Sequence, residues 1–470
     1  MLASSALGRR ARARDSADVV VIGAGLAGLN AAMILEAEGM TVIVLEAADY
    51  IGGRTKTLDL PIGPTNAGAE TVGPYYGRVR DLVGRLGVAF IPVPPRVAMG
   101  NYVNGALVSS ADWSKAKANR TVGAERDVQP EALEFYYLSK SNPLPDPESW
   151  TDAKYAGYDI PLETYLRNAG ASDEAIRLVN VSINTVDLAT GSALAYLRDI
   201  RRLQWDMANT NDKTRSTYGA SAADGFESNL IKGGTQRLAE AMAGGLKGEV
   251  RLHQTVRSIE MTSSGVDVRT IDGSRFTAKY VVSAVPFSAL RNVEVFPNFP
   301  GPQLAAIHGS THGHTLRVFL EFTAPFWEAD IGEPGLFTDT AIERVFARRN
   351  EAGEIYALDC WVNGSAATRL DQLPSDAVTD FVVKTVNRIR PSTQGKLKAV
   401  KMHSWAKHSA SACCRHVFNA GQVGKWAGLM ATPHLRLHLA GEQTRSIENG
   451  MEAAAESGER AAYEILAREG

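Results

Sequence analysis

The residues ADVVVIGAGLAGLNAAMILEAEGMTVIVLEAADYIGGRTKT, at positions 17–57, decide the fold of this chain. The stretch opens with a short run of β-branched residues, which is typical of a buried parallel strand. The run leads into GAGLAG at positions 23–28, a G-x-G-x-x-G sequence. Gly23 permits a tight turn, Gly25 lets backbone N–H groups approach a pyrophosphate, and Gly28 lets the next helix pack on the strand. We therefore expect phosphates to bind at the N-terminus of that helix.

The residues after the glycines complete a βαβ unit. Apolar residues recur at helical spacing, and Gly39 stands where a left-handed residue would end the helix. Residues 41–45 form the second predicted strand. Glu46 follows at the interval expected for the acid that binds the ribose hydroxyls, and its carboxylate would repel a 2′-phosphate. The unit therefore favours NAD or FAD over NADP.

The continuation IGGRT at positions 51–55 decides between the two nucleotides. Its glycines let a loop lie against the far side of the pyrophosphate, where Gly53 would pass closely and Arg54 would pair bidentately. With this motif the chain resembles the flavin-containing amine oxidases, a family that includes monoamine, polyamine, hydroxynicotine and L-amino-acid oxidases. Flavin desaturases share the opening motif. The resemblance implies FAD as the cofactor.

Composition agrees with a globular enzyme. Of 470 residues, 44% are hydrophobic and 22% are charged, and the net charge is −2, which gives no reason to expect a nucleic-acid or membrane partner. Three cysteines exclude a disulfide framework and favour a reducing, cytoplasmic location. Residues 1–17 are basic and lack an apolar core, so we expect a disordered leader. A homodimer is compatible with the sequence.

The resemblance implies an α/β fold in which a Rossmann-type FAD-binding domain is interleaved with an α+β substrate-binding domain. Glycine-bearing segments and short apolar strands mark the FAD-binding domain, and helical patterns with proline-rich breaks mark the other. We expect the FAD-binding domain at 18–75, 225–296 and 398–470, and the substrate domain at 76–224 and 297–397.

Three later segments carry further cofactor-binding residues of the family. Val256 stands where the family's backbone contacts the adenine. Glu442 lies in AGEQT at positions 440–444, and Met451 lies in NGMEAAA at positions 449–455. In the family the helix that starts at this second segment points its N-terminus at the flavin C2 carbonyl, where its partial positive charge stabilises the anion formed on reduction.

Two residues are candidates for the catalytic side of the flavin. Arg317 stands where the family has a lysine that is hydrogen-bonded through water to flavin N5. An arginine there could hold the same water, receive a substrate carboxylate or be purely structural. Trp405 matches the family tryptophan beside the ring and also counts among the cofactor-binding residues.

Five further residues are candidates for the substrate pocket: Glu70, His314, Cys414, Arg415 and Gly450. Glu70 could anchor a cationic amine or bind its own loop. His314 follows His308 and His312, but flavin chemistry needs no metal and we expect none. Cys413 or Cys414 stands where some monoamine oxidases carry a thioether link to the flavin, although non-covalent FAD is the default. Gly450 and a cysteine or arginine replace the two aromatic walls of the family's cage.

We therefore expect an FAD-dependent amine oxidase that transfers a hydride from an amine C–H to flavin N5. The imine would then be hydrolysed, and oxygen or another acceptor would take the electrons, with oxygen yielding hydrogen peroxide. Loss of both cage walls predicts a wide mouth and a bulky or polar amine, including one that resembles an amino acid. Two alternatives stay open: a desaturase or C–C oxidase of the same fold, and a catalytically silent flavoprotein.

Overall fold

A computed structural model gives the fold of most of the chain. The predicted leader lies outside the described residues except for its last three, and so does the part of the first substrate segment that follows residue 209. The structure describes residues 15–94, 97–183, 186–209, 228–350 and 352–469.

A five-stranded parallel sheet collects strands from the beginning, the middle and the end of the chain. Its order is β22-β13-β1-β2-β9. The strands are β1 (Val19–Ile22), β2 (Val42–Leu45), β9 (Val250–Arg251), β13 (Tyr280–Ser283) and β22 (Leu437–Leu439). Because the carboxyl ends of parallel strands meet at one edge of a sheet, these distant segments all deliver their next residues to one place.

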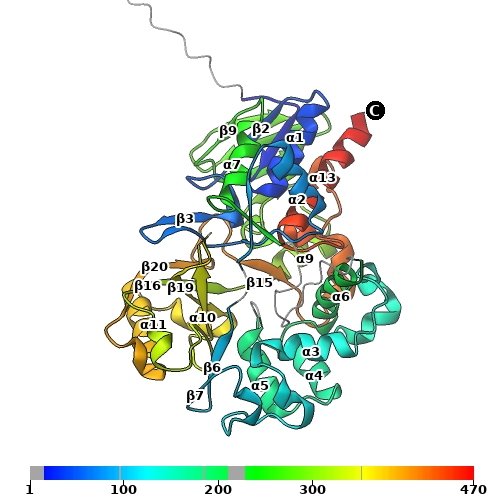
Figure 1. Cartoon of the computed structure of the whole chain (residues 1–470). Coiled ribbons are helices and arrows are strands. Elements are labelled where there is room, and N and C mark those ends of the chain that lie inside the picture. Colours follow the sequence, from blue (N-terminus) through cyan, green and yellow to red (C-terminus); the bar gives the residue numbers. More distant parts are fainter. Residues whose placement is uncertain (1–14, 95–96, 184–185, 210–227, 351, 470) are drawn as a thin grey trace, which may run out of the picture.

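Helix α1 (Leu26–Ala37) packs against the last helix of the chain, α13 (Gly450–Glu469). Figure 1 shows the two side by side next to this sheet. The Asn30 side chain donates to the Ala455 carbonyl at 2.8 Å. A Cβ atom on Gly458 would fall 2.1 Å from the Ala27 carbonyl oxygen, so only glycine permits this close approach.

The strands and the helix predicted for the βαβ unit are confirmed, and their ends differ from the predicted ends by about one residue. The expected left-handed Gly39 has φ +86°. Strands β11 (Val266–Thr270) and β12 (Arg275–Ala278) form a hairpin. This hairpin belongs to a second, four-stranded sheet that also holds β10 (Val256–Met261) and β14 (Glu294–Phe296).

The other half is built on a seven-stranded sheet of order β20-β16-β19-β18-β17-β6-β7. Helices α10 (Gly364–Leu370) and α11 (Ser375–Ile389) lie beside it (Figure 1). Its strands are β6 (Met99–Val103), β7 (Ala106–Val108), β16 (Thr315–Phe322), β17 (Gly335–Thr338), β18 (Arg344–Arg349), β19 (Ile355–Asn363) and β20 (Leu397–Ser404). Strand β20 crosses the border expected at 398, because it pairs with β16 and so belongs to this sheet and not to the parallel one.

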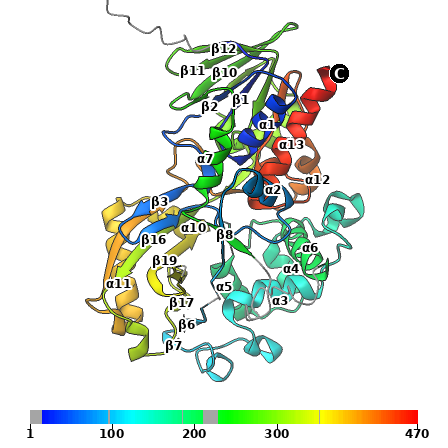
Figure 2. The same ribbon diagram turned by 45° about the horizontal axis from the view of Figure 1, so that its top comes forward.

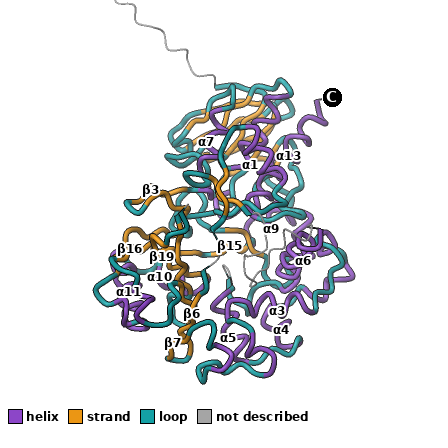
Figure 3. Tube along the Cα trace, in the orientation of Figure 1, coloured by secondary structure: helices purple, strands orange, loops and turns teal. Residues whose placement is uncertain are grey.

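A helical lobe faces that sheet across the lower half of the molecule, as Figures 2 and 3 show. It contains α3 (Leu133–Lys140), α4 (Leu162–Asn168), α5 (Asp173–Ser182) and α6 (Ala193–Asn209). None of the helices in the described part of the chain is both long and apolar enough to cross a membrane.

Further short elements complete the fold. They are β3 (Thr57–Leu60) with β4 (Gly63–Asn66), β5 (Phe90–Pro92) with β8 (Asn229–Ile231), β15 (Thr311–Gly313) with β21 (Arg415–Val417), and the helices α2 (Gly77–Arg85), α7 (Gln236–Gly244), α8 (Phe287–Leu290), α9 (Gly301–Gly309) and α12 (Val423–Trp426).

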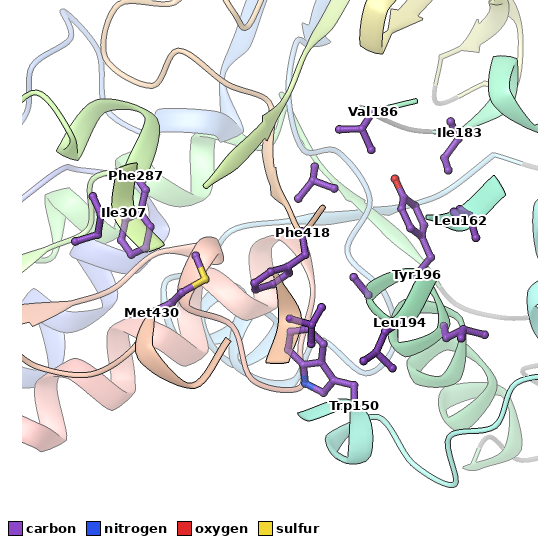
Figure 4. Close-up of a cluster of buried hydrophobic side chains, with 14 of the residues drawn as sticks. Trp150, Leu162, Ile183, Val186, Leu194, Tyr196, Phe287, Ile307, Phe418 and Met430 are labelled. Carbon is purple, nitrogen blue, oxygen red and sulfur yellow. The ribbon is translucent and has the colours of Figure 1, made fainter. Parts of the chain in front are cut away.

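One hydrophobic core joins the helical lobe to the C-terminal segment. The rings of Trp150 and Phe418 meet edge to face with centroids 5.4 Å apart. Figure 4 shows Phe418 among side chains of the lobe, including Tyr196 and Leu194 of α6. Burial of these large side chains, at about 25 cal/mol per Å² of apolar surface, fixes the lobe against the segment that carries Cys414 and Arg415.

Candidate active site

A cavity of about 770 Å³ extends from the carboxyl end of β1 to the helical lobe. Residues from the parallel sheet, the loops after it and helices α3, α6 and α13 line it together. The predicted residues that line it are Gly23, Gly25, Glu46, Gly53, Arg54, Val256, Cys414, Arg415, Glu442, Gly450 and Met451. The cavity thus joins the predicted cofactor site to part of the predicted substrate pocket.

The glycine turn has the shape of a phosphate cradle. Gly23 adopts φ +105°, and a Cβ atom on Gly28 would fall 2.0 Å from the Gly23 carbonyl oxygen. Gly25 is the N-cap residue of α1 and forms a bridge with Gly52 of the second glycine loop. No side chain caps this helix, so its first N–H groups and the positive end of its dipole are directed at the cavity. These features fit the pyrophosphate of a dinucleotide.

Glu46 ties the turn to the end of β2. It is 5% exposed, and its carboxylate accepts hydrogen bonds from the backbone N–H of Ala24 at 2.7 Å and of Ala48 at 2.8 Å. Burial raises the pKa of Glu46, and these backbone donors oppose the rise. The carboxylate is therefore oriented at the cavity wall, where a ribose would meet it.

Arg54 and Glu442 bring the second glycine loop to the C-terminal segment. Their side chains are 3.4 Å apart, and Arg445 donates to the other Glu442 oxygen at 2.8 Å. Burial opposes ionisation of Glu442, but Arg445, Arg54 and Arg415 outweigh it and lower the pKa. The cluster therefore keeps a fixed charge pattern along the cavity wall.

Gly450 and Met451 form the N-terminus of α13 at the cavity. Gly450 has φ +57°, and the Tyr76 hydroxyl lies 3.4 Å from the point where its Cβ would stand. Tyr75 lines the cavity next to Tyr76. Sequence reasoning missed both tyrosines, although two aromatic residues directly after the Gly73-Pro74 turn were a visible signal. Tyr75 and Tyr76 therefore narrow the cavity on the side where Gly450, which replaces an aromatic wall of the family's cage, was expected to widen it.

The two adjacent cysteines point to different places. Cys413 is fully buried, accepts a hydrogen bond from the Ser288 hydroxyl at 3.2 Å and does not line the cavity, whereas Cys414 does. Burial raises the pKa of both thiols. Neither environment favours a thiolate at neutral pH.

Arg317 lies behind the cavity wall and not in it. It is 1% exposed, its Nε is 3.2 Å from the Asp359 carboxylate, and its Nη2 donates to the same carboxylate. Its Nη1 donates to the Asn66 carbonyl at 2.6 Å. Trp361 and Phe319 pack against the guanidinium with 5.0 Å from its carbon to each ring centroid. Arg317 therefore contacts the end of β4, where the loop to the cavity begins, from the β16–β19 side.

Trp405 contacts the same loop one residue further on. It is 1% exposed, and its Nε1 donates to the Ala67 carbonyl at 2.9 Å. A Cβ atom on Gly68 would fall 1.9 Å from the Arg54 carbonyl and 2.9 Å from the Trp405 ring. Trp405 and Arg317 together fix the loop that leads to Ala69, which does line the cavity.

Glu70 and His314 do not line the cavity. The Glu70 carboxylate pairs with Arg348 of β18 at 2.5 and 2.7 Å, which matches neither role considered for it from sequence. His314 lies between β15 and β16, where its carbonyl accepts from the Gly364 N–H. Across the described ranges, no group of three or more His, Cys, Asp and Glu side chains is arranged to hold a metal ion.

The helical lobe supplies a wall of the cavity that sequence reasoning did not identify. Residues of two helices and of the turn before the first one form it: Glu131 in the turn, Glu134 and Phe135 in the first turn of α3, and Tyr196, Asp199, Ile200, Arg202 and Leu203 on α6. Arg415 pairs with Asp199 at 3.0 Å, and Arg202 pairs with Glu448 at 2.6 Å. Charged residues within an otherwise apolar helix face were the available signal, but only the tertiary structure places the two faces opposite the cofactor half.

The parallel sheet, the two glycine loops and the ribose-side acid define a dinucleotide-binding α/β protein with a separate substrate-side sheet and helical lobe. Comparison with known proteins is more specific. The family described as "Flavin containing amine oxidoreductase" matches residues 188–466, and an NAD(P)-binding Rossmann-like domain matches residues 21–86. Because the first match covers more than half of the chain, this protein belongs to the flavin-containing amine oxidase family. It is an oxidoreductase that acts on amines, and its cofactor is FAD.

Individual relatives are distant but match over almost the full length. The flavin-containing amine oxidase B of Homo sapiens is 24% identical over 96% of this chain and 86% of its own. A flavin-containing amine oxidase of Danio rerio is 24% identical over 96% of this chain and 85% of its own. Among solved structures, a wild-type putrescine oxidase bound to putrescine superposes with a TM-score of 0.77 at 20% identity, covering 96% of this chain and 99% of its own. Cyclohexylamine oxidase from Brevibacterium oxydans gives 0.78 at 19% identity, with the same coverage.

Proposed function

We propose that this protein oxidises a C–N bond of a bulky or polar amine by hydride transfer from the α-carbon to flavin N5. Hydrolysis of the imine and reduction of oxygen to hydrogen peroxide complete the cycle. The observation that carries the proposal is the continuity of one cavity from the glycine turn, past Met451, to the α3–α6 wall. Similar structures are those of enzymes named for putrescine and cyclohexylamine.

FAD, when bound, supplies the hydride acceptor, and the residues of the chain hold and orient the reactants. The first N–H groups of α1 bind the pyrophosphate, and Glu46 binds the ribose. The N-terminus of α13 at Met451 presents its partial positive charge to the ring. The apolar and aromatic wall excludes water from the reacting amine, which raises the effective strength of every charge inside.

Arg317 and Trp405 act as positioning residues in this proposal. Both donate to carbonyls of consecutive residues, Asn66 and Ala67, in the loop that leads to the cavity wall. These two hydrogen bonds come from side chains that are themselves buried and packed, so they hold the loop at a fixed position behind the cavity wall. The loop then sets the distance between the ring and the amine, on which hydride transfer depends steeply.

Non-covalent FAD is the proposed form of the cofactor. The cysteine at the cavity, Cys414, is kept protonated by burial, and its neighbour Cys413 is turned towards Ser288. We expect acid precipitation of the yellow protein to leave the flavin in the supernatant. Flavin that stays with the pellet would contradict this form, and Cys414→Ala would then identify the attachment.

Anaerobic mixing with a panel of amines tests the reaction. We expect the oxidised flavin absorbance near 450 nm to bleach, and admission of oxygen to restore it with release of peroxide and ammonia or a smaller amine. A flavin that no amine bleaches would favour the silent flavoprotein. Bleaching by a substrate that loses no nitrogen would favour the desaturase or C–C oxidase.

A further inference from the structure

Arg198 of α6 is fully buried, and its hydrogen bonds go to the residues that directly precede α13. Its Nη1 atom donates to the carbonyls of Ile447 at 3.1 Å and Glu448 at 3.3 Å, and to the Oδ1 atom of Asn449 at 2.5 Å. Across the described ranges, its Nε and Nη2 atoms have no hydrogen-bond partner. A buried guanidinium that leaves two nitrogens unpaired is costly, so the three contacts of the third nitrogen call for an explanation.

The surroundings keep this guanidinium charged and in place. Its Nη1 atom lies 3.2 Å from the Asp199 carboxylate, which also pairs with Arg415 at 3.0 Å. Its carbon lies 5.0 Å from the centroid of the Trp150 ring. Burial lowers the pKa of Arg198 to about 10, with Asp199 opposing the fall and nearby arginines adding to it. Arg198 therefore remains a charged donor at neutral pH.

Asn449 stands where the cap of α13 is expected. It directly precedes the helix, and its carbonyl accepts the N–H of Ala453, as the carbonyl of a cap residue does. An asparagine in this position ordinarily turns its side-chain oxygen onto the N–H groups of the first turn. Here that oxygen accepts from Arg198, and in the part of the chain that the structure describes no N–H of α13 donates to it.

The acid in the first turn of α13 is also bound elsewhere. Glu452 is 1% exposed, and its two carboxylate oxygens accept the backbone N–H groups of Arg78 and Val79, each at 3.0 Å. Those N–H groups belong to the first turn of α2, so Glu452 caps that helix and not its own. Gly450 and Met451 therefore bring an uncapped helix N-terminus, with its partial positive charge, to the cavity.

We propose that Arg198 holds the Asn449 side chain away from the first turn of α13 and thereby raises the reduction potential of the flavin. The inference rests on the proposed position of the ring at Met451. Hydride transfer breaks the α-C–H bond of the amine, moves its electron pair to flavin N5, leaves an iminium group on the substrate and adds one negative charge to the ring. Uncapped N–H groups stabilise that charge, whereas a cap oxygen would occupy them and weaken their field.

Arg198 is a positioning residue in this proposal, because it acts on the ring through Asn449 and the helix. It belongs to the helical lobe, whereas α13 belongs to the half of the molecule that binds the cofactor. One side chain of the substrate side thus adjusts how readily the flavin accepts electrons.

The reduction potential of the holoenzyme tests the proposal without any amine. The enzyme and a redox dye of known potential are reduced together without oxygen, and the absorbance at equilibrium gives the ratio of reduced to oxidised flavin. In Arg198→Met the Asn449 side chain is free to cap α13, and we expect this ratio at a fixed dye potential to fall about three- to fivefold. The segment keeps a second anchor, because Arg202 still pairs with Glu448 at 2.6 Å.

A second substitution separates the cap from the loss of charge. In the double variant Arg198→Met/Asn449→Ala the cap oxygen is absent, and we expect the ratio to return to within about twofold of wild type. Loss of charge or packing at Arg198 would not be reversed by removing the Asn449 side chain. A wild-type ratio in Arg198→Met, or a double variant as low as Arg198→Met, would therefore overturn the proposal.

Asn449→Ser makes the same test with Arg198 intact. Serine is a strong cap residue, but its side chain is one bond shorter and does not reach Arg198 as asparagine does. We expect its ratio to lie below that of Asn449→Ala, which should match wild type, and equal ratios in these two variants would also overturn the proposal.

Arg201→Met is the matched control on the same helix, because the Arg201 guanidinium donates to the Asn142 carbonyl at 2.9 Å and not to the segment before α13. We expect it to leave the ratio unchanged, and a fall as large as that in Arg198→Met would contradict the proposal. Flavin content and the unfolding midpoint confirm that the variants are folded. None of these results depends on an amine, so the proposed function fails separately, if no amine bleaches the wild-type flavin.

Discussion

At the scale of single residues, the unusual feature of the chain is an arginine where its family has lysine. Arg317 is not a free cation beside the ring but one half of a buried pair with Asp359. Its planar fork spans that carboxylate and the Asn66 carbonyl at once, and a lysine ammonium could not satisfy both with the same geometry.

We expect the Arg317→Lys variant to bind FAD. We expect anaerobic flavin reduction to slow by roughly ten- to a hundredfold, because the loop at Asn66 is no longer held in a fixed position. The apparent Kd for the amine should change little. Rapid-mixing measurements over a range of amine concentrations separate these two constants. Arg390→Lys is a control, because Arg390 is as buried as Arg317 and pairs with a carboxylate, that of Asp330, outside the cavity. A reduction rate that falls as far in the control would refute the positioning role.

Glu343 is a second residue whose surroundings predict a measurable effect. It is 7% exposed, and the backbone and side-chain N–H groups of Asn363 donate to it. Burial raises its pKa to about 8, with Arg344 opposing the rise. In the unfolded chain the pKa is near its ordinary value, so between the two pKa values the folded protein holds a proton that the unfolded chain has lost.

This difference lowers the free energy of unfolding as pH rises from about 5 to 8, by at most about 1.4 kcal/mol per pH unit. Glu343→Gln removes the titration and should flatten that slope relative to wild type. Denaturant unfolding at several pH values measures it. Glu260→Gln, at an exposed position, should keep the wild-type slope, and a Glu343→Gln slope equal to that of wild type would contradict the assignment.

At the scale of elements, the β1–α1 turn carries the cofactor site because the start of α1 packs within atomic contact of the turn itself. A methyl group on Gly28 would overlap the Gly23 carbonyl, and moving that carbonyl would move the N-terminus of α1. The same argument does not hold for every helical glycine, since nothing lies within 4 Å of a Cβ placed on Gly84 of α2.

We therefore expect Gly28→Ala to be isolated with little or no flavin, and Gly84→Ala to bind flavin as wild type does. The ratio of absorbance at 450 and 280 nm after gel filtration measures the bound fraction. A yellow Gly28→Ala with the wild-type ratio would show that the turn tolerates the shift and that the cradle is less rigid than the contact distance implies.

At the scale of the whole molecule, the cavity is assembled from segments that are hundreds of residues apart. Gly23, Val256 and Met451 come from three parts of the sequence and line one space. A ligand that spans them can bind only when all three parts are in place. Such binding stabilises the folded state by mass action, because the unfolded chain offers no such site.

We expect FAD to raise the free energy of unfolding by about 1.4 kcal/mol for each tenfold excess over its dissociation constant. FMN, which lacks the adenosine half expected at Val256, should raise it less at equal concentration. Thermal unfolding at a series of nucleotide concentrations measures both effects. Equal stabilisation by the two nucleotides would contradict a site that extends to the adenine end.

For the FAD-binding half of the molecule, the residue types along the chain were sufficient to predict the structure. The glycine turn, Glu46 and the Gly450–Met451 junction each depend on residues close in sequence, so their structure followed from turn chemistry and strand length. The chain alone therefore determined an α/β dinucleotide fold, FAD and the family resemblance.

Only the tertiary structure decided what surrounds the substrate. Arg317 is withdrawn from the cavity because Asp359, on a neighbouring strand 42 residues away, binds it. Tyr76 stands beside Gly450, and Glu134 is left facing Arg415 and Asp199, because packing of the lobe brings distant elements to one wall. Pairing between residues remote in sequence leaves no periodic or motif signal, since it depends on which faces of different elements meet.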